Sequence, residues 1–205
     1  MIVPRENLNM LIAGVGGQGV LVASYVIGQL ALNSGLKVRI SEDIGQAQRG
    51  GPVVSHVRLG EGSYAPINTL HTVDLVIGFE PLEAYRNTIE FLRPMGEVVF
   101  NTEPVYLASN PRKEEVHYPP VEMMATAIKK IARRIVQLDA GDLAQKAGNP
   151  TAVNMVMLGA AIATGLPFTV SDTENLIKNT IPRDSAGNLR AFHYGFSEAK
   201  ERMLT

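Results

Sequence analysis

The chain of 205 residues contains no cysteine. It therefore cannot form a disulfide, supply a thiol nucleophile, bind zinc through thiolates or ligate an iron–sulfur cluster by itself. A cysteine-free composition suits a reducing compartment, and the N-terminal sequence MIVPRENLN lacks the charged and then apolar pattern of a secretion signal. The sequence thus predicts a cytoplasmic protein.

The chain also has little net charge and no uninterrupted long apolar run. Its formal net charge is −1, which gives no basic surface for nucleic acid or for an anionic membrane. The longest apolar stretch, residues 151–170, is broken by an asparagine, two glycines and a proline. A helix at its start would be roughly 22 Å long, shorter than the ~30 Å hydrocarbon core, so we expect a buried helix and no membrane span.

Apolar periodicity predicts an alternation of strands and helices. Strands are expected at residues 9–13, 36–40, 52–59, 73–78, 97–100 and 135–138, and helices at 17–33, 81–92, 122–132, 150–164, 171–179 and 189–203. The first strand, helix and second strand read as one βαβ unit with a right-handed crossover. No repeat or linker divides the chain, so residues 1–205 are expected to form a single α/β domain. It should have a mainly parallel sheet, helices on both faces and a helical C-terminal extension.

Three of these helices carry further signals. The apolar helix near residue 150 has Asn149 as the expected N-cap, Pro150 as its first residue and Gly165 at its end. The helix at 17–33 is apolar on nearly every side and must be covered on more than one face. The last helix has a narrow apolar stripe, which we expect to dock on its own domain, the alternative being a partner; the stripe consists of Leu189, Phe192, Phe196, Ala199 and Met203.

A glycine-rich turn follows the first strand in the stretch LIAGVGGQGVLVAS, residues 11–24. Three glycines fit the pattern G-x-G-x-x-G; the turn comprises Gly14, Gly16, Gly17, Gln18 and Gly19. Glycines let the backbone turn tightly, and the free amides and dipole at the start of the next helix attract an anion. The alternative interpretation is that the glycines only permit close packing.

An acidic residue in the same region supports a different class of function. Glu42 lies 23 residues after Gly19, where a nicotinamide-binding fold places its ribose-binding acid. A stand-alone NAD(P)-binding oxidoreductase is therefore one alternative function. A nucleotide-sensing regulatory module without an enzymatic partner is another.

The second polar cluster is SEDIGQAQRGGPVVSHVR, residues 41–58. Gln48 and Arg49 precede Gly50 and Gly51 in a loop that follows a predicted strand. A guanidinium suits a phosphate or a carboxylate, and paired glycines can expose amides to an anion. The alternative is that the arginine pairs with a nearby carboxylate and fixes a surface loop.

Four stretches together resemble the gamma subunits or domains of 2-oxoacid:ferredoxin oxidoreductases. They are GVGGQGVLVAS, GQAQRGGPVVSHVR, VDLVIGFEPLEA and GNPTAVNMVMLGA; they occur in the family's order and cover most of residues 9–163. The form AQRGG followed by VVSHVR looks most like the beta subunit of indolepyruvate ferredoxin oxidoreductase. Gamma subunits of pyruvate or 2-oxoglutarate ferredoxin oxidoreductases are the alternatives.

This resemblance implies a Rossmann-like accessory domain without catalytic residues, inactive when isolated. The holoenzyme oxidatively decarboxylates a 2-oxoacid, passes electrons to ferredoxin and releases an acyl-CoA. Thiamine diphosphate, Mg and the [4Fe–4S] clusters are implied on partner catalytic subunits, so this chain alone holds no cofactor. A contact with CoA and a homodimer of the isolated chain are left open.

The site residues follow from the same resemblance. The glycine turn would form one wall of an anion-binding or subunit-facing cleft, and the second cluster would form the opposing loop, made of Gln48, Arg49, Gly50 and Gly51. A Gly-Asp-Leu string at residues 141–143 lacks the second glycine of a thiamine diphosphate motif.

The remaining polar residues are expected to be structural. Adjacent strand residues point to opposite faces, so Ser55 cannot pair with His56 as a nucleophile and base. The other three histidines show no metal-ligand spacing, and no metal site is expected. They are His71, His117 and His193.

Three further features allow two interpretations or suggest a supporting role. Glu80 either contacts a partner or ligand or caps the helix that begins at Pro81. Asn154 is expected to tie its helix to the glycine turn. The basic residues are expected on a solvated helix face, the alternative being a contact with ferredoxin or a CoA phosphate; they are Lys129, Lys130, Arg133 and Arg134.

Overall fold

The computed structural model describes residues 7–44, 50–62, 64–105 and 118–204. Its strands are β1 (Asn7–Val15), β2 (Val38–Asp43), β3 (Pro52–Gly60), β4 (Val73–Gly78), β5 (Leu92–Asn101) and β6 (Arg134–Leu138). Its helices are α1 (Val20–Asn33), α2 (Pro81–Phe91), α3 (Val121–Lys129), α4 (Ala140–Lys146), α5 (Val153–Ala163), α6 (Val170–Thr180) and α7 (Ser185–Leu204).

The six strands form one sheet in the order β2-β3-β1-β4-β5-β6. Strands β1, β4, β5 and β6 are parallel neighbours, whereas β3 is antiparallel to both β1 and β2. The expectation of a mainly parallel sheet is therefore confirmed. The predicted βαβ unit forms as well, since β1 and β2 are both antiparallel to β3 and therefore run parallel to each other. Its two strands are not neighbours, because β3 lies between them.

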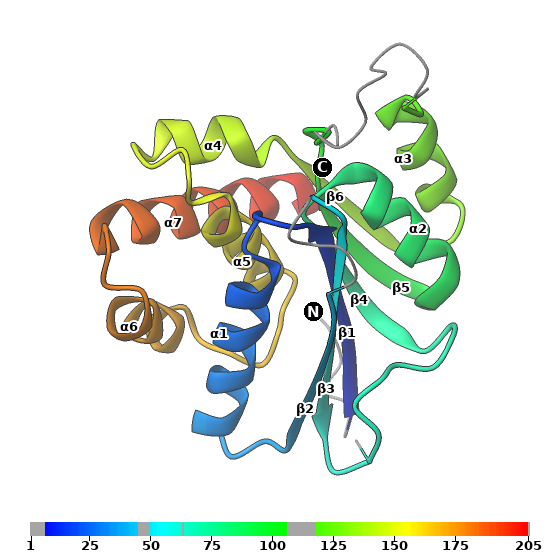
Figure 1. Ribbon diagram of the computed structural model, residues 1–205, viewed down its shortest axis with the longest axis horizontal. Coiled ribbons are helices and arrows are strands. Elements are labelled where there is room, and N and C mark those ends of the chain that lie inside the picture. Colours follow the sequence, from blue (N-terminus) through cyan, green and yellow to red (C-terminus); the bar gives the residue numbers. More distant parts are fainter. Residues whose placement is uncertain (1–6, 45–49, 63, 106–117, 205) are drawn as a thin grey trace.

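Helices cover both faces of the sheet, as expected (Figure 1). Helices α2 and α3 lie on one face, and α1 with the C-terminal helices lies on the other. The C-terminal stripe docks on this chain and not on a partner, because Phe192 and Ala199 are buried in the core shared with α1 and α5.

Helix α1 begins at Val20, three residues later than predicted, since Gly17, Gln18 and Gly19 form the turn itself. The sheet covers one side of α1, and α5 and α6 cover a second side. A third stripe stays exposed even though α1 contains no charged residue.

Other boundaries also differ from the predictions, among them the start of β5 at Leu92, not at residue 97, and the start of α7 at Ser185, not at residue 189. Helix α5 begins at Val153, because residues 149–152 form a tighter turn in which Asn149 Oδ1 accepts from Thr151 N at 3.2 Å. Helix α6 is capped by Thr169, two residues before the expected start. The short helix α4 was not predicted, since seven residues carry little periodic signal.

Neither a membrane-spanning helix nor a cluster of metal-ligating side chains is found among the described residues. No helix there is long and apolar enough to cross a bilayer. The same residues contain no cluster of three histidine, aspartate or glutamate side chains that could hold a metal ion.

Candidate functional site

The glycine turn lies at the carboxyl end of β1, beside Gly51, the last residue of the predicted QRGG loop, residues 48–51. Strand β1 ends at Val15, and the next residue, Gly16, donates its N–H to Gly51 O at 3.0 Å. The glycine turn therefore contacts the start of β3, which follows the QRGG loop. Gln48 and Arg49 lie outside the described residues, so their predicted role stays a prediction.

Three backbone amides around the start of α1 form no hydrogen bond with any described residue. Gly17 is exposed, and Gly19 adopts a left-handed conformation with φ +83° immediately before the helix. Within the described ranges, no hydrogen bond is formed by the amides of Gly17, Gly19 or Val20. A helix start with unsatisfied N–H groups and a positive dipole end can bind an anion such as a phosphate.

The Gln18 side chain faces inward and fixes the turn. Its Oε1 accepts from Val15 N at 2.9 Å, and its Nε2 donates to Phe79 O at 3.0 Å. Phe79 follows β4, so this one amide group joins the carboxyl ends of two neighbouring parallel strands. Gln18 is thus a residue that shapes the site, and its amide is already engaged within the protein.

A second carboxamide continues this connection across the sheet. Asn101, at the end of β5, donates from Nδ2 to the same Phe79 O at 3.2 Å, and its Oδ1 accepts from Ala140 N at 3.0 Å. Sequence reasoning missed Asn101. The available signal was a polar residue directly after a buried strand, at the sheet edge where α/β proteins bind ligands.

Two glycines of the turn permit close packing. A Cβ on Gly14 would lie 2.9 Å from Phe79 Cβ and Val20 Cγ2, and a Cβ on Gly19 would lie 2.7 Å from Asn154 Nδ2. Asn154, on α5, therefore packs against the turn, as expected. The turn combines both interpretations, since Gly14 and Gly19 serve packing while the amides at the start of α1 stay open.

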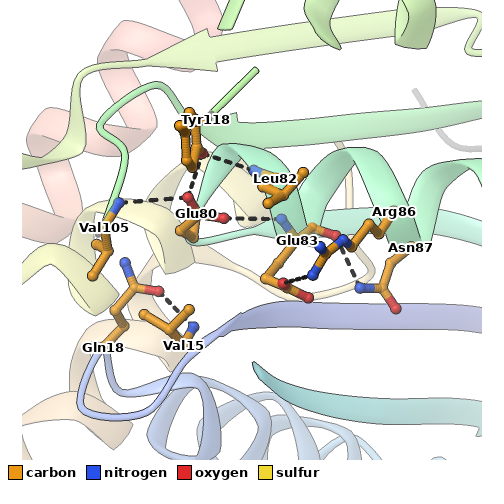
Figure 2. Close-up of polar contacts among 9 residues, drawn as sticks. All are labelled: Val15, Gln18, Glu80, Leu82, Glu83, Arg86, Asn87, Val105 and Tyr118. Carbon is orange, nitrogen blue, oxygen red and sulfur yellow. Dashed lines mark hydrogen bonds and ion pairs between the residues drawn. The ribbon is translucent and has the colours of Figure 1, made fainter. Parts of the chain in front are cut away.

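Glu80 is the buried acid of this edge, and it caps α2 (Figure 2). Its Oε2 accepts from Glu83 N at 2.9 Å, and its Oε1 accepts from the Tyr118 hydroxyl and from Val105 N. Tyr118 Oη in turn accepts from Leu82 N at 3.1 Å. The capping interpretation is confirmed, and the carboxylate is engaged within the protein.

Glu83 lies beside this cap, in the first turn of α2. Burial raises the pKa of its carboxyl group, and the Arg86 guanidinium, 2.9 Å from Glu83 Oε1, opposes this effect. Because Arg86 is largely exposed, the pair contributes little to stability.

Glu42 does not occupy the position that a nicotinamide site requires. It lies within β2, and β3 separates β2 from the strand that carries the glycine turn. Its Oε1 accepts from Ser24 Oγ of α1 at 3.4 Å. Neighbouring strands are about 4.8 Å apart, so the inserted strand moves this carboxylate one strand farther from the turn.

His56 is a buried histidine with a structural role. Its Nδ1 accepts from Asn68 N at 3.3 Å, and its ring packs edge-on against Phe91. Desolvation lowers the pKa of His56 below 6.5, although the carboxylates of Asp43 and Glu90 oppose the shift. The folded protein therefore holds this ring neutral.

We expect His56 to make stability depend on pH. The unfolded chain binds a proton at His56 near pH 6.5 and the folded chain only at lower pH, so stability is lost as the pH falls below 6.5. The midpoint of thermal unfolding should fall as the pH is lowered from about 8 to about 5. His56→Gln should make this fall smaller. The exposed His71→Asn is the control. An unchanged profile in His56→Gln would contradict this origin.

The basic cluster divides into two parts. Arg133 and Arg134 follow α3 and do not lie on a helix face, so the expectation is wrong for them in this respect. Both pair with the buried Glu97, with Arg134 Nη1 3.5 Å from Glu97 Oε2, although Arg133 stays exposed. Lys129 and Lys130, at the end of α3, are exposed as expected.

The other two described histidines lie at the surface. His71 is exposed in a left-handed conformation, and His193 Nε2 lies 3.0 Å from Glu174 Oε1. His117 lies outside the described residues.

Comparison with known proteins identifies the family. Residues 9–198 match the pyruvate ferredoxin/flavodoxin oxidoreductase family. The chain belongs to this family. It is 38% identical to indolepyruvate oxidoreductase subunit IorB of Methanothermobacter thermautotrophicus, over 95% of this chain and 99% of that subunit. It is 29% identical to the common gamma subunit of the pyruvate/ketoisovalerate oxidoreductases of Pyrococcus abyssi, over 82% of this chain and 83% of that subunit.

Solved structures of the family share the fold. The gamma subunit of a keto/oxoacid ferredoxin oxidoreductase from Geobacter sulfurreducens has a TM-score of 0.68 at 19% identity, over 94% of this chain and 98% of that subunit. The 2-oxoglutarate:ferredoxin oxidoreductase of Magnetococcus marinus, solved with 2-oxoglutarate, coenzyme A and succinyl-CoA bound, has a TM-score of 0.74 at 20% identity. The match covers 97% of this chain but 32% of that longer one.

Proposed function

We propose that this chain is the accessory subunit of an oxidoreductase that converts an arylpyruvate of the indolepyruvate type to an acyl-CoA and passes the electrons to ferredoxin. The observation that carries this proposal is the similarity, almost from end to end, to an indolepyruvate oxidoreductase subunit. The common gamma subunit of the pyruvate/ketoisovalerate enzymes is less similar over a shorter stretch. The proposal treats residues 1–205 as one cytoplasmic gamma-type domain.

The residues of this chain support a role without bond-making. The turn between β1 and α1 consists of glycines and one glutamine whose amide is engaged, so it offers no group that could transfer a proton. The chain has no cysteine to ligate an iron–sulfur cluster. Thiamine diphosphate, which would supply the decarboxylation chemistry when bound, and the [4Fe–4S] clusters are therefore assigned to a partner catalytic subunit.

The glycine turn is proposed to bind and orient the phosphates of CoA. Its open amides at the start of α1 fit an anion, and Gly51 lies against Gly16 so that the QRGG loop borders the same edge. In this proposal Arg49 supplies the opposing positive charge, with Gln48 and Gly50 beside it. Gln18 and Asn101 hold the edge in shape by joining β1, β4 and β5.

Co-purification and reconstitution test the proposal. A tagged chain produced with its thiamine-binding partner should purify as a complex with iron–sulfur absorbance. The complex should reduce ferredoxin when given indolepyruvate and CoA. Each component alone should be inactive. Pyruvate and 2-oxoglutarate are the comparison substrates, and a preference for either would assign the chain to the other enzymes of the family.

Two results would overturn the proposal. One is decarboxylation of indolepyruvate by the isolated chain. The other is micromolar NAD(H) binding that Glu42→Ala removes and Glu42→Gln retains in part, since this pattern would show a ribose contact.

A further inference from the structure

Strand β2 forms one edge of the described sheet. At the opposite edge, β6 packs against α7, whose Met203 Sδ accepts from Arg134 NH1 at 3.4 Å. The outer side of β2 pairs with no described strand. Unpaired N–H and C=O groups along such an edge favour the addition of another strand. Edge strands that resist pairing often carry charged residues or proline. Strand β2 (Val38–Asp43) has no proline, and its three charged residues, Arg39, Glu42 and Asp43, are of both signs.

The pairing of β2 with β3 determines which residues point outward. Gly60 N donates to Lys37 O at 2.9 Å, which makes Lys37 and Gly60 a hydrogen-bonded pair. Because such pairs alternate along an antiparallel ladder, residues 39, 41 and 43 also bond to β3. The N–H and C=O groups of residues 38, 40 and 42 therefore point away from the sheet. Val38 O accepts from Arg39 Nη1 at 3.0 Å, so the backbone groups left for a further strand are those of Ile40 and Glu42.

An exposed apolar stripe of α1 adjoins this edge. Val22, Tyr25 and Leu32 are 37%, 51% and 54% exposed on a helix without a charged residue. The neighbouring side of α1 lies over β2, since a Cβ on Gly28 would lie 2.7 Å from Ile40 Cδ1. The outer edge of β2 and this stripe form one surface, which we call the β2–α1 surface.

We propose that the β2–α1 surface binds a second copy of this chain, with β2 paired antiparallel to β2 of the other copy about a two-fold axis at Ser41. A two-fold axis perpendicular to the sheet puts equivalent faces of the two copies on the same side. Side chains alternate between the faces along a strand, so an odd-numbered residue pairs with an odd-numbered one and an even-numbered residue with an even-numbered one. With Ser41 opposite itself, Ile40 and Glu42 of the two copies form the hydrogen-bonded pairs through their outward-pointing backbone groups.

The charged side chains of β2 favour the pairing with Ser41 opposite itself. Arg39 of each copy lies opposite Asp43 of the other, on the face of the sheet that carries α2, and both side chains are exposed. The two-fold axis repeats this opposite-charge pair. A shift by two residues would place Arg39 opposite Ser41 and would replace each pair by Lys37 opposite Asp43. That register is less favoured, because Lys37 Nζ already pairs with Glu61 at 2.5 Å. Cross-strand pairs of opposite charge stabilise a sheet, whereas like charges oppose pairing.

The exposed apolar stripe of α1 is also suited to contact the same stripe of the second copy. Gly28 lies over Ile40, and Ser24 bonds to Glu42, so α1 runs along β2 with its middle near the proposed axis. The two-fold axis therefore brings the N-terminal end of one stripe, at Val22, toward the C-terminal end of the other, at Leu32. Both ends are apolar, which fits a surface that must complement itself.

Sedimentation velocity of the isolated full chain over increasing concentration tests the proposal. The wild type should form a dimer, and Arg39→Asp should weaken it at least about tenfold by turning two attractive pairs into repulsive ones. Arg39→Asp combined with Asp43→Arg should restore it. Lys129→Asp, an equal change of charge on α3, should have no effect. A wild type that stays monomeric, or equal effects of Arg39→Asp and Lys129→Asp, would overturn the proposal.

Two further pairs of variants separate pairing from folding. Glu42→Pro removes an outward N–H and should abolish the dimer, whereas Glu42→Thr keeps that N–H and the dimer. Tyr25→Lys should weaken the dimer, and Met123→Lys, at a similarly exposed apolar residue of α3, should not. Circular dichroism verifies that each variant is folded. Since no cofactor or catalytic subunit is present, a failure here leaves the proposed oxidoreductase function untouched.

Hydrogen exchange adds an independent measurement of the same surface. The amides of Ile40 and Glu42 should become protected as the chain concentration rises. Protection that requires the catalytic subunit, with none from self-association, would assign the surface to that subunit and overturn the dimer.

Discussion

Replacing Gly195 with alanine is expected to lower the free energy of unfolding by about 3 kcal/mol, and replacing it with valine should prevent folding. The reason is the close crossing of α5 and α7. A Cβ on Gly195 would lie 1.9 Å from Val156 O, and a Cβ on Gly159 would lie 2.0 Å from Phe192 O. Both clashes are with backbone atoms, so no rotamer change relieves them and the helices must separate.

Denaturant unfolding followed by circular dichroism measures this effect, and Gly28→Ala is the matched control. Gly28 is also a helical glycine, but its Cβ would meet only the Cδ1 end of the flexible Ile40 side chain. Alanine is favoured over glycine within a helix by about 1 kcal/mol, so Gly28→Ala should be close to neutral or stabilising. A loss below about 0.5 kcal/mol for Gly195→Ala would show that the crossing is not as tight as described.

The second large effect is expected at the glycine turn, where Gly19→Ala should destabilise the protein by about 3 kcal/mol and Gly17→Ala by about 1 kcal/mol. Both glycines have a positive φ, of +83° and +94°, so alanine is strained at either position. Only Gly19 faces a close neighbour, because its Cβ would lie 2.7 Å from Asn154 Nδ2, whereas the space around Gly17 is open.

Thermal or denaturant unfolding compares the two variants, and Asn154→Ala tests the cause of the difference. In the background of Asn154→Ala, Gly19→Ala should cost less than in the wild-type background, because the close atoms Nδ2 and Cγ are removed. The cost should stay above that of Gly17→Ala, since the Cβ of residue 154 lies 3.0 Å from the added methyl group and is kept by alanine. The reconstituted enzyme should show a raised KM for CoA in Gly19→Ala, since the start of α1 shifts. Equal losses for Gly17→Ala and Gly19→Ala in the wild-type background would refute the packing argument.

The carboxyl edge of the sheet is built to be rigid. Gln18 and Asn101 both donate to Phe79 O, and together they link the ends of β1, β4 and β5 to the start of α4. Glu80 adds Tyr118 and Val105 to the same edge through one buried carboxylate. An edge held by fixed amides, with the buried Glu80 carboxylate engaged, is suited to holding a ligand in place.

The sequence by itself determined the α/β class, the family and most of the elements. Alternating periodicities identified the strands and helices, and glycine and proline positions marked several of their ends, as at Pro81 and Gly165. The absence of cysteine excludes an iron–sulfur cluster held by thiolates of this chain, and the four family stretches indicated the family. These features are local in the chain or depend on composition, so they can be read without knowledge of long-range contacts.

Only the tertiary structure decided how these elements are arranged. No local pattern shows that β3 inserts between β1 and β2, because strand order depends on pairings between residues far apart in the chain. That insertion separates Glu42 from the glycine turn and leaves β2 at the sheet edge. The inward-facing amide of Gln18 bonds to Phe79, 61 residues later, and a contact of this kind exists only once the sheet has formed.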